Sequence, residues 1–137
     1  MSRASNEPLL AVLGAFAASL RWGGIPESAR AAARVQVLDV VAAAHAGALS
    51  GEASRLFESF PAGSGPSTAI TMGRRHGPAE AAFVNAAHSM SQDYDDIMWM
   101  GHTGHSAVFS SLAVAEAEKK TSREVVTAVV VANEIAG

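Results

Sequence analysis

Apolar positions recur along most of this chain at the three- and four-residue spacing of helices that bury one face. The pattern starts behind Asn6 and Pro8, a helix cap and a first-turn residue, and connections that contain Gly and Pro interrupt it. Helices are therefore predicted over residues 8–20, 25–49, 51–60, 79–90, 105–118 and 125–136. A brief extended segment is predicted over 68–72, and Arg74-Arg75-His76-Gly77-Pro78 is predicted to be a solvated basic turn. This order of elements predicts an all-α helical bundle.

Some helices carry specific expectations about burial. The run 40–49 is apolar on every side, which predicts burial all round and a packed His45 within it. The last helix begins with a capping box, in which the hydroxyl of Thr121 and the carboxylate of Glu124 bond backbone N–H groups. The side chains expected on the buried faces of the third and fourth helices are Leu56, Phe57, Phe60, Phe83, Ala86, Ala87 and Met90.

Composition limits the class of protein. The 137 residues form a single domain, and 49% of them are hydrophobic against 17% charged, so we expect another chain to cover one face. A formal net charge of -3 disfavours nucleic acid and anionic membranes as partners. The sequence contains no Cys, which excludes disulfides and thiol nucleophiles. The longest apolar runs are shorter than the ~20 residues of a membrane span, and the N-terminus does not resemble a signal peptide, so we expect a cytoplasmic protein.

The side chains with the most chemistry lie between residues 92 and 105. Gln92-Asp93-Tyr94-Asp95-Asp96 is followed by Gly101-His102-Thr103-Gly104-His105, and an Ala-rich predicted helix lies on either side. A polar connection between helices presents a site on a rigid scaffold. An aspartate beside an imidazole is the simplest proton-transfer pair, because the carboxylate orients the ring. The alternative is a solvated acidic turn followed by a loop with chance histidines.

This part of the chain resembles the MmgE/PrpD family, which includes 2-methylcitrate dehydratase and cis-aconitate decarboxylase. The resemblance is carried by Asn85-Ala86-Ala87-His88, Asp93-Tyr94-Asp95-Asp96, His102, Leu112-Ala113-Val114-Ala115-Glu116, Ser122-Arg123-Glu124 and Asn133-Glu134-Ile135-Ala136-Gly137. It implies that residues 1–137 are the N-terminal part of the family's helical domain. Chains of this family are considerably longer, so the resemblance implies either an N-terminal piece of a longer chain or the small subunit of a split enzyme. In the second case another polypeptide carries the rest of the fold and the site, and a homo-oligomer is also expected.

The resemblance implies a lyase that moves a proton alpha to a carboxylate. The dehydration of a hydroxy acid by a hydro-lyase is the expected reaction, with a decarboxylase or an isomerase or epimerase as alternatives. His102 is implied as the acid/base and Asp93 as the residue that orients or polarises. The expected substrate-binding residues are Thr103, His105, Tyr94 and Arg74, the last as a cation for a carboxylate. Neither a metal nor a cofactor is implied.

The sequence departs from the family at Ile97, where members often have a Thr that contacts substrate. The neighbouring Met98-Trp99-Met100 gives the loop an apolar lining, so the substrate is expected to be less charged or bulkier than the family's known ones. Asp95 and Asp96 are expected to bond helix N–H groups or neighbouring side chains, and His88 is expected to be structural.

Two alternatives remain open. His102 and His105, with Asp93 or Asp96, could bind a divalent ion, but histidines at this spacing on a Gly-bearing loop lack the helical presentation of the usual metal motifs. The chain could also be a non-catalytic helical assembly subunit whose polar loop has lost its role.

Overall fold

A computed structural model describes residues 8–58, 63–94, 96–97 and 101–136 of the chain. Within them the order of elements is α1 (Leu9–Ser19), η1 (Trp22–Gly24), α2 (Glu27–Ser50), α3 (Glu52–Glu58), β1 (Ser67–Ala69), η2 (Ile70–Met72), β2 (Arg74–His76), α4 (Pro78–Met90), α5 (Gly104–Ala117) and α6 (Ser122–Ala136). The fold is mostly helical with one small hairpin, which confirms the all-α prediction. The expected cap Asn6 and the residues Phe60, Asp95, Met98, Trp99 and Met100 lie outside the described residues.

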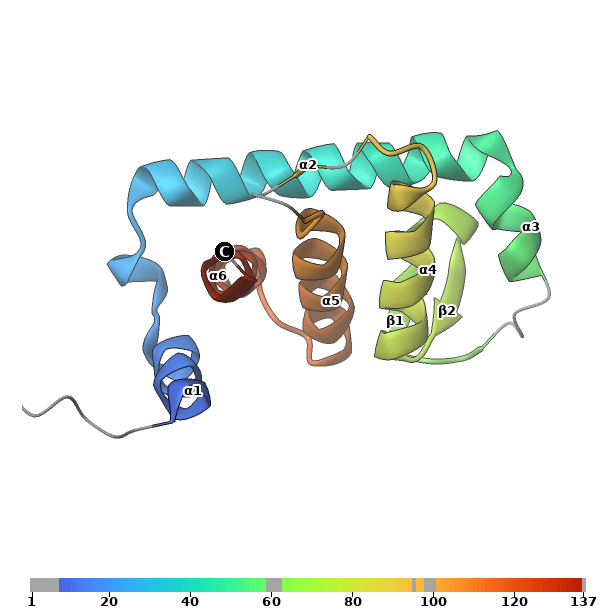
Figure 1. Cartoon of the computed structure of the whole chain (residues 1–137). Helices are drawn as coiled ribbons and strands as arrows, with labels where there is room; N and C mark the ends of the chain where they lie inside the picture. Colours follow the sequence, from blue (N-terminus) through green and yellow to red (C-terminus); the bar gives the residue numbers. More distant parts are fainter. Residues whose placement is uncertain (1–7, 59–62, 95, 98–100, 137) are drawn as a thin grey trace, which may run out of the picture.

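Helix α2 is the element against which the others pack. Figure 1 shows it running across the molecule, with α4, α5 and α6 on one side of it and α1 set apart near its beginning. It starts after Pro26 and ends at Gly51, whose φ of 80° is the left-handed conformation that favours glycine at a helix end. The main core lies between α2, α5 and α6 and consists of Ala33, Val40, Ala44, Val108, Phe109, Val126 and Val129.

By length and composition, α2 is apolar enough to cross a membrane, and it is the one such helix among the described residues. The core helix of a globular protein passes the same test. In this fold Ala33, Val40 and Ala44 of α2 are buried against α5 and α6. One side of α2 therefore contributes apolar side chains to the core.

A short antiparallel hairpin replaces the predicted solvated turn. β1 and β2 pair with Ser67 opposite His76 and Ala69 opposite Arg74, and His76 is buried. Arg75 forms an ion pair with Glu116 of α5, which also accepts hydrogen bonds of 2.7 Å from the backbone N–H and the hydroxyl of Thr68. The predicted turn was wrong because these partners, distant in sequence, hold the segment extended.

The polar contacts of Glu116 also affect its protonation. Burial alone would raise the pKa of this carboxyl. The hydrogen bonds from Thr68 and from Arg75, together with the charge of Arg75, outweigh burial and lower the pKa below its usual value of 4.5. Glu116 therefore stays ionised and fastens the hairpin to α5.

Several predicted buried side chains are exposed instead. His45 lies on the outer side of α2 and bonds the carbonyl of Val41 at 2.9 Å, and Leu49 is 89% exposed. Phe83 and Met90 of α4 are also exposed, whereas Phe57 is buried as predicted. The prediction of burial all round α2 was wrong because α4, α5 and α6 cover only one side of this helix.

The last helix begins as the sequence predicted. The carboxylate of Glu124 accepts hydrogen bonds from the backbone N–H of Thr121 at 2.8 Å and from its hydroxyl at 2.9 Å. The backbone N–H of Glu124 in turn donates to the Thr121 hydroxyl at 3.4 Å. These contacts confirm the capping box. The backbone hydrogen bond from Thr121, followed by that of its hydroxyl, lowers the pKa of Glu124.

Candidate active site

The loop between α4 and α5 begins with an unusual backbone conformation at Asp93. The backbone N–H of Asp93 donates to the carbonyl of Met90 at 3.1 Å, and its φ is 56°. This left-handed region is costly for most side chains, although Asp and Asn tolerate it best. The turn directs the Asp93 carboxylate outward, where it is 85% exposed.

His102 stands just before α5 and faces Asp93. Its Nε2 lies 3.7 Å from Oδ1 of Asp93, within ion-pair distance when the ring is protonated. The imidazole is 30% exposed, so it is partly shielded while still reachable from solvent. The two residues that the family resemblance implied as acid/base and orienting residue are thus neighbours in the fold.

The ring of His102 lines a groove of about 390 Å³ between α5 and α6. Its polar walls come from the hydroxyls of Thr103, Ser106, Ser110 and Ser111, and its apolar walls come from Ala107, Ala132 and Ala136. Oγ1 of Thr103 is buried and has no hydrogen-bond partner among the described residues. The serines were not predicted, because a hydroxyl on a helix carries no distinctive sequence signal.

His105 belongs to a different groove. It lines a depression of about 440 Å³ between α4 and α5, whose other walls are Ala79, Ala82, Phe83, Ala86, Ala87, Met90, Ser106 and Ser110. The two grooves share only Ser106 and Ser110 among their described lining residues. The fold therefore places Thr103 beside His102 and separates His105 from it.

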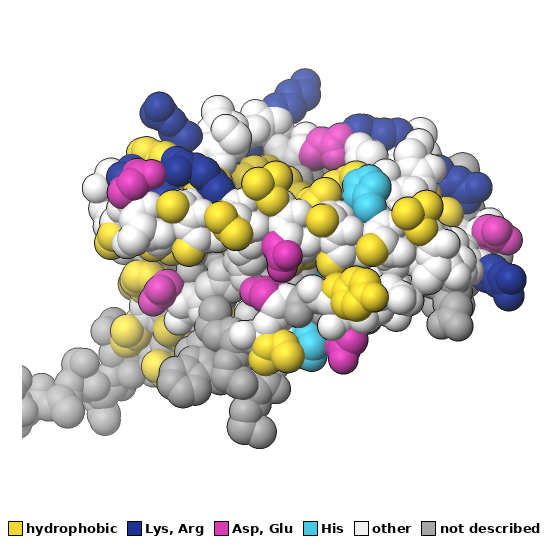
Figure 2. Space-filling model, turned by 90° about the horizontal axis from the view of Figure 1, so that it is seen from above, with side chains coloured by type: hydrophobic (Ala, Val, Ile, Leu, Met, Phe, Trp, Pro, Cys, Tyr) yellow, Lys and Arg dark blue, Asp and Glu magenta, His cyan; other side chains and the backbone are white. Residues whose placement is uncertain are grey.

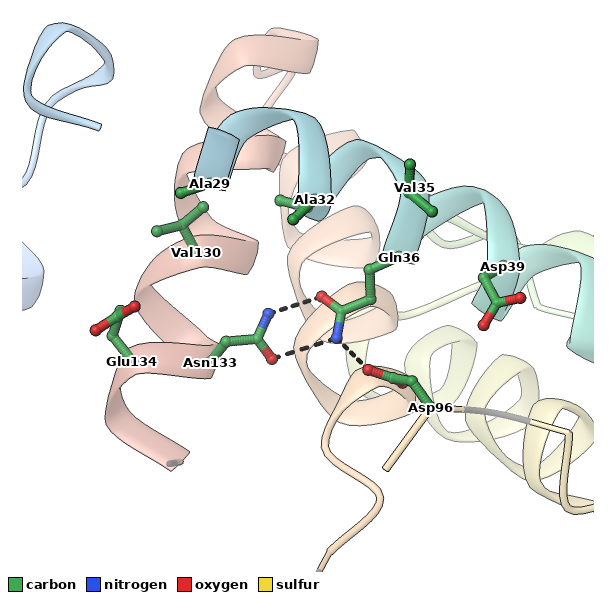
Figure 3. A pocket seen from close by; sticks show the side chains of 10 residues that line it. Ala29, Ala32, Val35, Gln36, Asp39, Asp96, Val130, Asn133 and Glu134 are labelled. Atoms are coloured by element: carbon green, nitrogen blue, oxygen red, sulfur yellow. Dashed lines mark hydrogen bonds between the residues drawn. The ribbon is translucent and has the colours of Figure 1, made fainter. Parts of the chain in front are cut away.

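Asp96 ties the loop to two helices, as Figure 3 shows. Its Oδ2 accepts a hydrogen bond of 2.5 Å from Nε2 of Gln36 in α2. The Gln36 amide oxygen in turn accepts a bond of 2.7 Å from Nδ2 of Asn133 in α6. Asp96 therefore bonds a neighbouring side chain, one of the two roles expected for it. The role of Gln36 was not predicted, because its partners Asp96 and Asn133 are 60 and 97 residues away in the sequence.

The carboxylate of Asp96 also lies against Gly104, the first residue of α5. A Cβ at Gly104 would overlap Oδ1 of Asp96, so a side chain at this position would displace the Asp96 carboxylate. This Oδ1 is buried and has no hydrogen-bond partner among the described residues. Asp96, Asp39 and Glu134 line a depression of about 560 Å³ between α2 and α6, whose remaining walls are mostly small apolar side chains (Figure 3).

Two further residues, Tyr94 and Arg74, were predicted to bind substrate, and a metal site was the alternative. Tyr94 is exposed on the loop next to Asp93. Arg74 begins β2, where it pairs with Ala69, and the hairpin is bonded to α5 through Glu116 and to α4 through Asn85. No group of three or more His, Asp or Glu side chains is placed to hold a metal ion in the part of the chain that the structure describes. The metal alternative thus gains no support from the described geometry.

His88 is wholly buried at the end of α4. Its Nδ1 lies 2.7 Å from the hydroxyl of Thr71, its Nε2 lies 3.4 Å from that of Ser54, and its ring packs edge-on against Phe57. Burial lowers the pKa of His88, because desolvation disfavours the charged ring. These contacts fit the structural role expected for it.

The comparison with protein families confirms the resemblance to the MmgE/PrpD family. The family described as "MmgE/PrpD N-terminal domain" matches residues 11–137. The chain belongs to the MmgE/PrpD family. No curated protein and no solved structure matches it. The MmgE/PrpD family includes lyase-type enzymes, and the matched region is its N-terminal domain.

Proposed function

We propose that this MmgE/PrpD N-terminal domain contributes Asp93 and His102 to a lyase site that acts on a carboxylic acid. The reaction we favour is the dehydration of a hydroxy acid. The observation that carries the proposal is the 3.7 Å approach of His102 Nε2 to Asp93 Oδ1 beside a hydroxyl-lined groove. Neither a metal nor a cofactor is part of the proposed chemistry.

In the proposed reaction, the neutral imidazole of His102 accepts the proton on the carbon alpha to the substrate carboxylate. The electron pair of that C–H bond forms a C=C bond as the C–O bond on the neighbouring carbon breaks. The departing hydroxide takes a proton from an acid outside the described residues and leaves as water. Asp93 stabilises the imidazolium that forms, because an opposite charge lies within ion-pair distance.

The substrate carboxylate is proposed to lie in the groove between α5 and α6. Ser106 and Ser110, which are both exposed, supply hydroxyl donors there. A carboxylate is bound more strongly by a cation, and the groove has none among its described lining residues. The cation is therefore proposed to come from elsewhere, with Arg74 as the candidate named in this chain.

A second polypeptide or a second copy of the chain is part of the proposal. Helix α1 has no buried residue, although its sequence LLAVLGAFAAS carries no charge. Leu38 and Leu49 lie exposed on α2, and Figure 2, which looks down on this helix, shows a row of hydrophobic side chains along it. Surfaces of this kind usually mark an interaction site. We further propose that the assembled protein is cytoplasmic.

The same exposed surfaces favour a second candidate function, a non-catalytic helical assembly subunit. To separate the two, the protein is purified from its native source with whatever polypeptides accompany it, and hydroxy di- and tricarboxylic acids are followed by NMR. The lyase proposal expects an unsaturated acid, with turnover about 10²–10⁴-fold lower for His102→Gln. His45→Gln, an exposed histidine on α2, is the matched control and retains full turnover.

Each result of this assay assigns a function. Release of carbon dioxide, or inversion without loss of water, replaces dehydration by the decarboxylase or the isomerase alternative. A folded assembly that converts none of these acids contradicts the lyase proposal and favours the assembly subunit.

A further inference from the structure

Three guanidinium groups surround one indole at the beginning of α2. The Cζ atoms of Arg30, Arg34 and Arg123 lie 4.8, 5.5 and 5.7 Å from the centre of the Trp22 ring. Arg30 and Arg34 come from α2 and Arg123 from the first turn of α6, so the cluster joins segments far apart in the sequence. Figure 2 shows Lys and Arg side chains gathered at the end of the molecule where α2 begins.

Positive charge exceeds negative charge in this cluster. Glu27 pairs with Arg30 at 2.9 Å and with Arg34 at 3.1 Å, so one carboxylate serves two guanidinium groups. Arg123 makes no ion pair with any described residue. The nearby Glu124 is bonded to Thr121 and paired with Lys120 at 3.8 Å. Because the whole chain has a net charge of -3, this local excess of cations does not follow from its composition.

A groove of about 600 Å³ lies beside the cluster, between the end of α1 and α6. One wall is apolar and consists of Ala17, Leu20, Ala128, Val131 and Ala132. The remaining lining residues are Arg21, Trp22, Arg123, Glu124 and Thr127, and Arg123 and Glu124 come from the beginning of α6, before Ala128, Val131 and Ala132. The volume is within the range of roughly 300–1,000 Å³ usual for small-molecule sites.

The arginines of this region differ in how fully their donors are used. Arg21 donates to the carbonyls of Ala18 and Leu20, at 2.6 and 3.0 Å, at the end of α1. Nε of Arg30 is buried and has no hydrogen-bond partner among the described residues. The guanidinium of Arg123 lines the groove and is free of ion pairs within the described part of the chain.

We propose that this groove binds an organic anion with an aliphatic body, its carboxylate at the arginine end and its chain along the apolar wall. The planar guanidinium matches a carboxylate in shape and charge. The arginine end of this groove lies about 14 Å along α6 from Ala132, the only described residue that lines both this groove and the His102 groove. The proposal does not rest on the proposed lyase chemistry.

The proposal is tested by titrating the full protein with hexanoate and with hexanol, its neutral counterpart. A Trp99→Phe background leaves Trp22 as the only tryptophan, so emission reports on the cluster. Hexanoate is expected to change the emission in a saturable manner and to raise the unfolding temperature, and added salt is expected to weaken binding. Hexanol is expected to do neither.

Arg123→Gln is expected to raise the dissociation constant for hexanoate at least tenfold. Arg123→Lys, which keeps the charge but loses the planar fork, is expected to fall between Arg123→Gln and the unaltered protein. The matched control is Arg55→Gln on α3, at the opposite end of α2, which should bind as before. An equal response to hexanol, or hexanoate binding that Arg123→Gln leaves unchanged, would overturn the proposal and leave the stacked arginines as a purely structural clamp on Trp22.

Discussion

Gly47 of α2 lies directly against the main-chain carbonyl of His88 in α4. A Cβ at Gly47 would overlap that carbonyl oxygen and the hydroxyl oxygen of Ser91. The two helices therefore approach as closely as they do only because this position lacks a side chain. Since His88 and Ser91 directly precede the loop that carries Asp93, the contact also fixes where the candidate site begins.

Gly47→Ala is predicted to destabilise the fold by about 1–3 kcal/mol, because the added methyl group forces α2 and α4 apart. The matched control is Gly14→Ala in α1, where nothing lies within 4 Å of the added Cβ. There, the usual advantage of Ala over Gly in a helix applies, which is about 0.5–1 kcal/mol. Urea denaturation of both variants measures the difference. A Gly47→Ala variant at least as stable as the unaltered protein would refute this close approach.

The end of α5 contains a residue that glycine would suit better. Lys119 has a φ of 53°, and the N–H of Lys120 donates to the carbonyl of Ala115 at 2.8 Å, as in a Schellman motif. Lys119→Gly is predicted to stabilise the protein by about 1 kcal/mol, because the left-handed conformation strains a side chain. Lys120→Gly, one position later, should bring no gain. Thermal unfolding compares the two, and equal effects at both positions would contradict the assignment.

The burial of His88 predicts a stability that depends on pH. Because burial lowers its pKa from the usual 6.5, the unfolded chain binds the proton more readily than the folded one. The stabilisation is complete above pH 6.5 and is lost as the pH falls through the lower folded pKa. Glu116 and Glu124, whose pKa values are lowered from 4.5, add a second loss at more acidic pH.

Urea midpoints measured from pH 7.5 down to pH 4 test this dependence. His88→Gln is predicted to remove the loss that begins below pH 6.5 and to keep the loss caused by the carboxylates. The comparison variant His45→Gln alters an exposed histidine on α2 and should retain both. If His88→Gln showed the same pH dependence as the unaltered protein, His88 would not be the group responsible.

Sequence patterns predicted the helices well, because periodicity and end signals are local. The capping box at Thr121 and Glu124 appears with all three of its hydrogen bonds. Local sequence patterns did not predict the conformation or the burial of a segment where contacts with residues distant in the sequence determine them. The segment that begins at Arg74 is a strand because Arg75 reaches Glu116, and His45 is exposed because no described helix covers its side of α2.

The same limit applies to the candidate site. The proximity of Asp93 and His102 was expected from a motif within one short segment, and the structure brings them together. Gln36 and Asn133 come from helices remote in sequence, so nothing local indicates that they support Asp96. His105 is close to His102 in sequence but faces another groove, because α5 begins between them and turns the second ring away.

Replacement of Asp93 should separate stability from activity. Asn tolerates the left-handed conformation almost as well as Asp, so Asp93→Asn is predicted to change stability by less than about 0.5 kcal/mol, as exposed substitutions usually do. Turnover should still fall at least about tenfold, because the charge beside His102 is lost. Asp93→Val, a β-branched residue at the same φ, should lose stability as well. Turnover in the Asn variant equal to that of the unaltered protein would exclude a role for this charge.

Whether His102 removes the proton alpha to the substrate carboxylate is measured by the exchange of that proton with solvent. The assembled protein and a bound hydroxy acid are placed in D₂O, and NMR follows deuterium at the carbon alpha to the carboxylate. Steady exchange is expected in the unaltered protein, with a loss of about 10²–10⁴-fold in His102→Gln. Exchange that continues undiminished in the folded His102→Gln variant would contradict it.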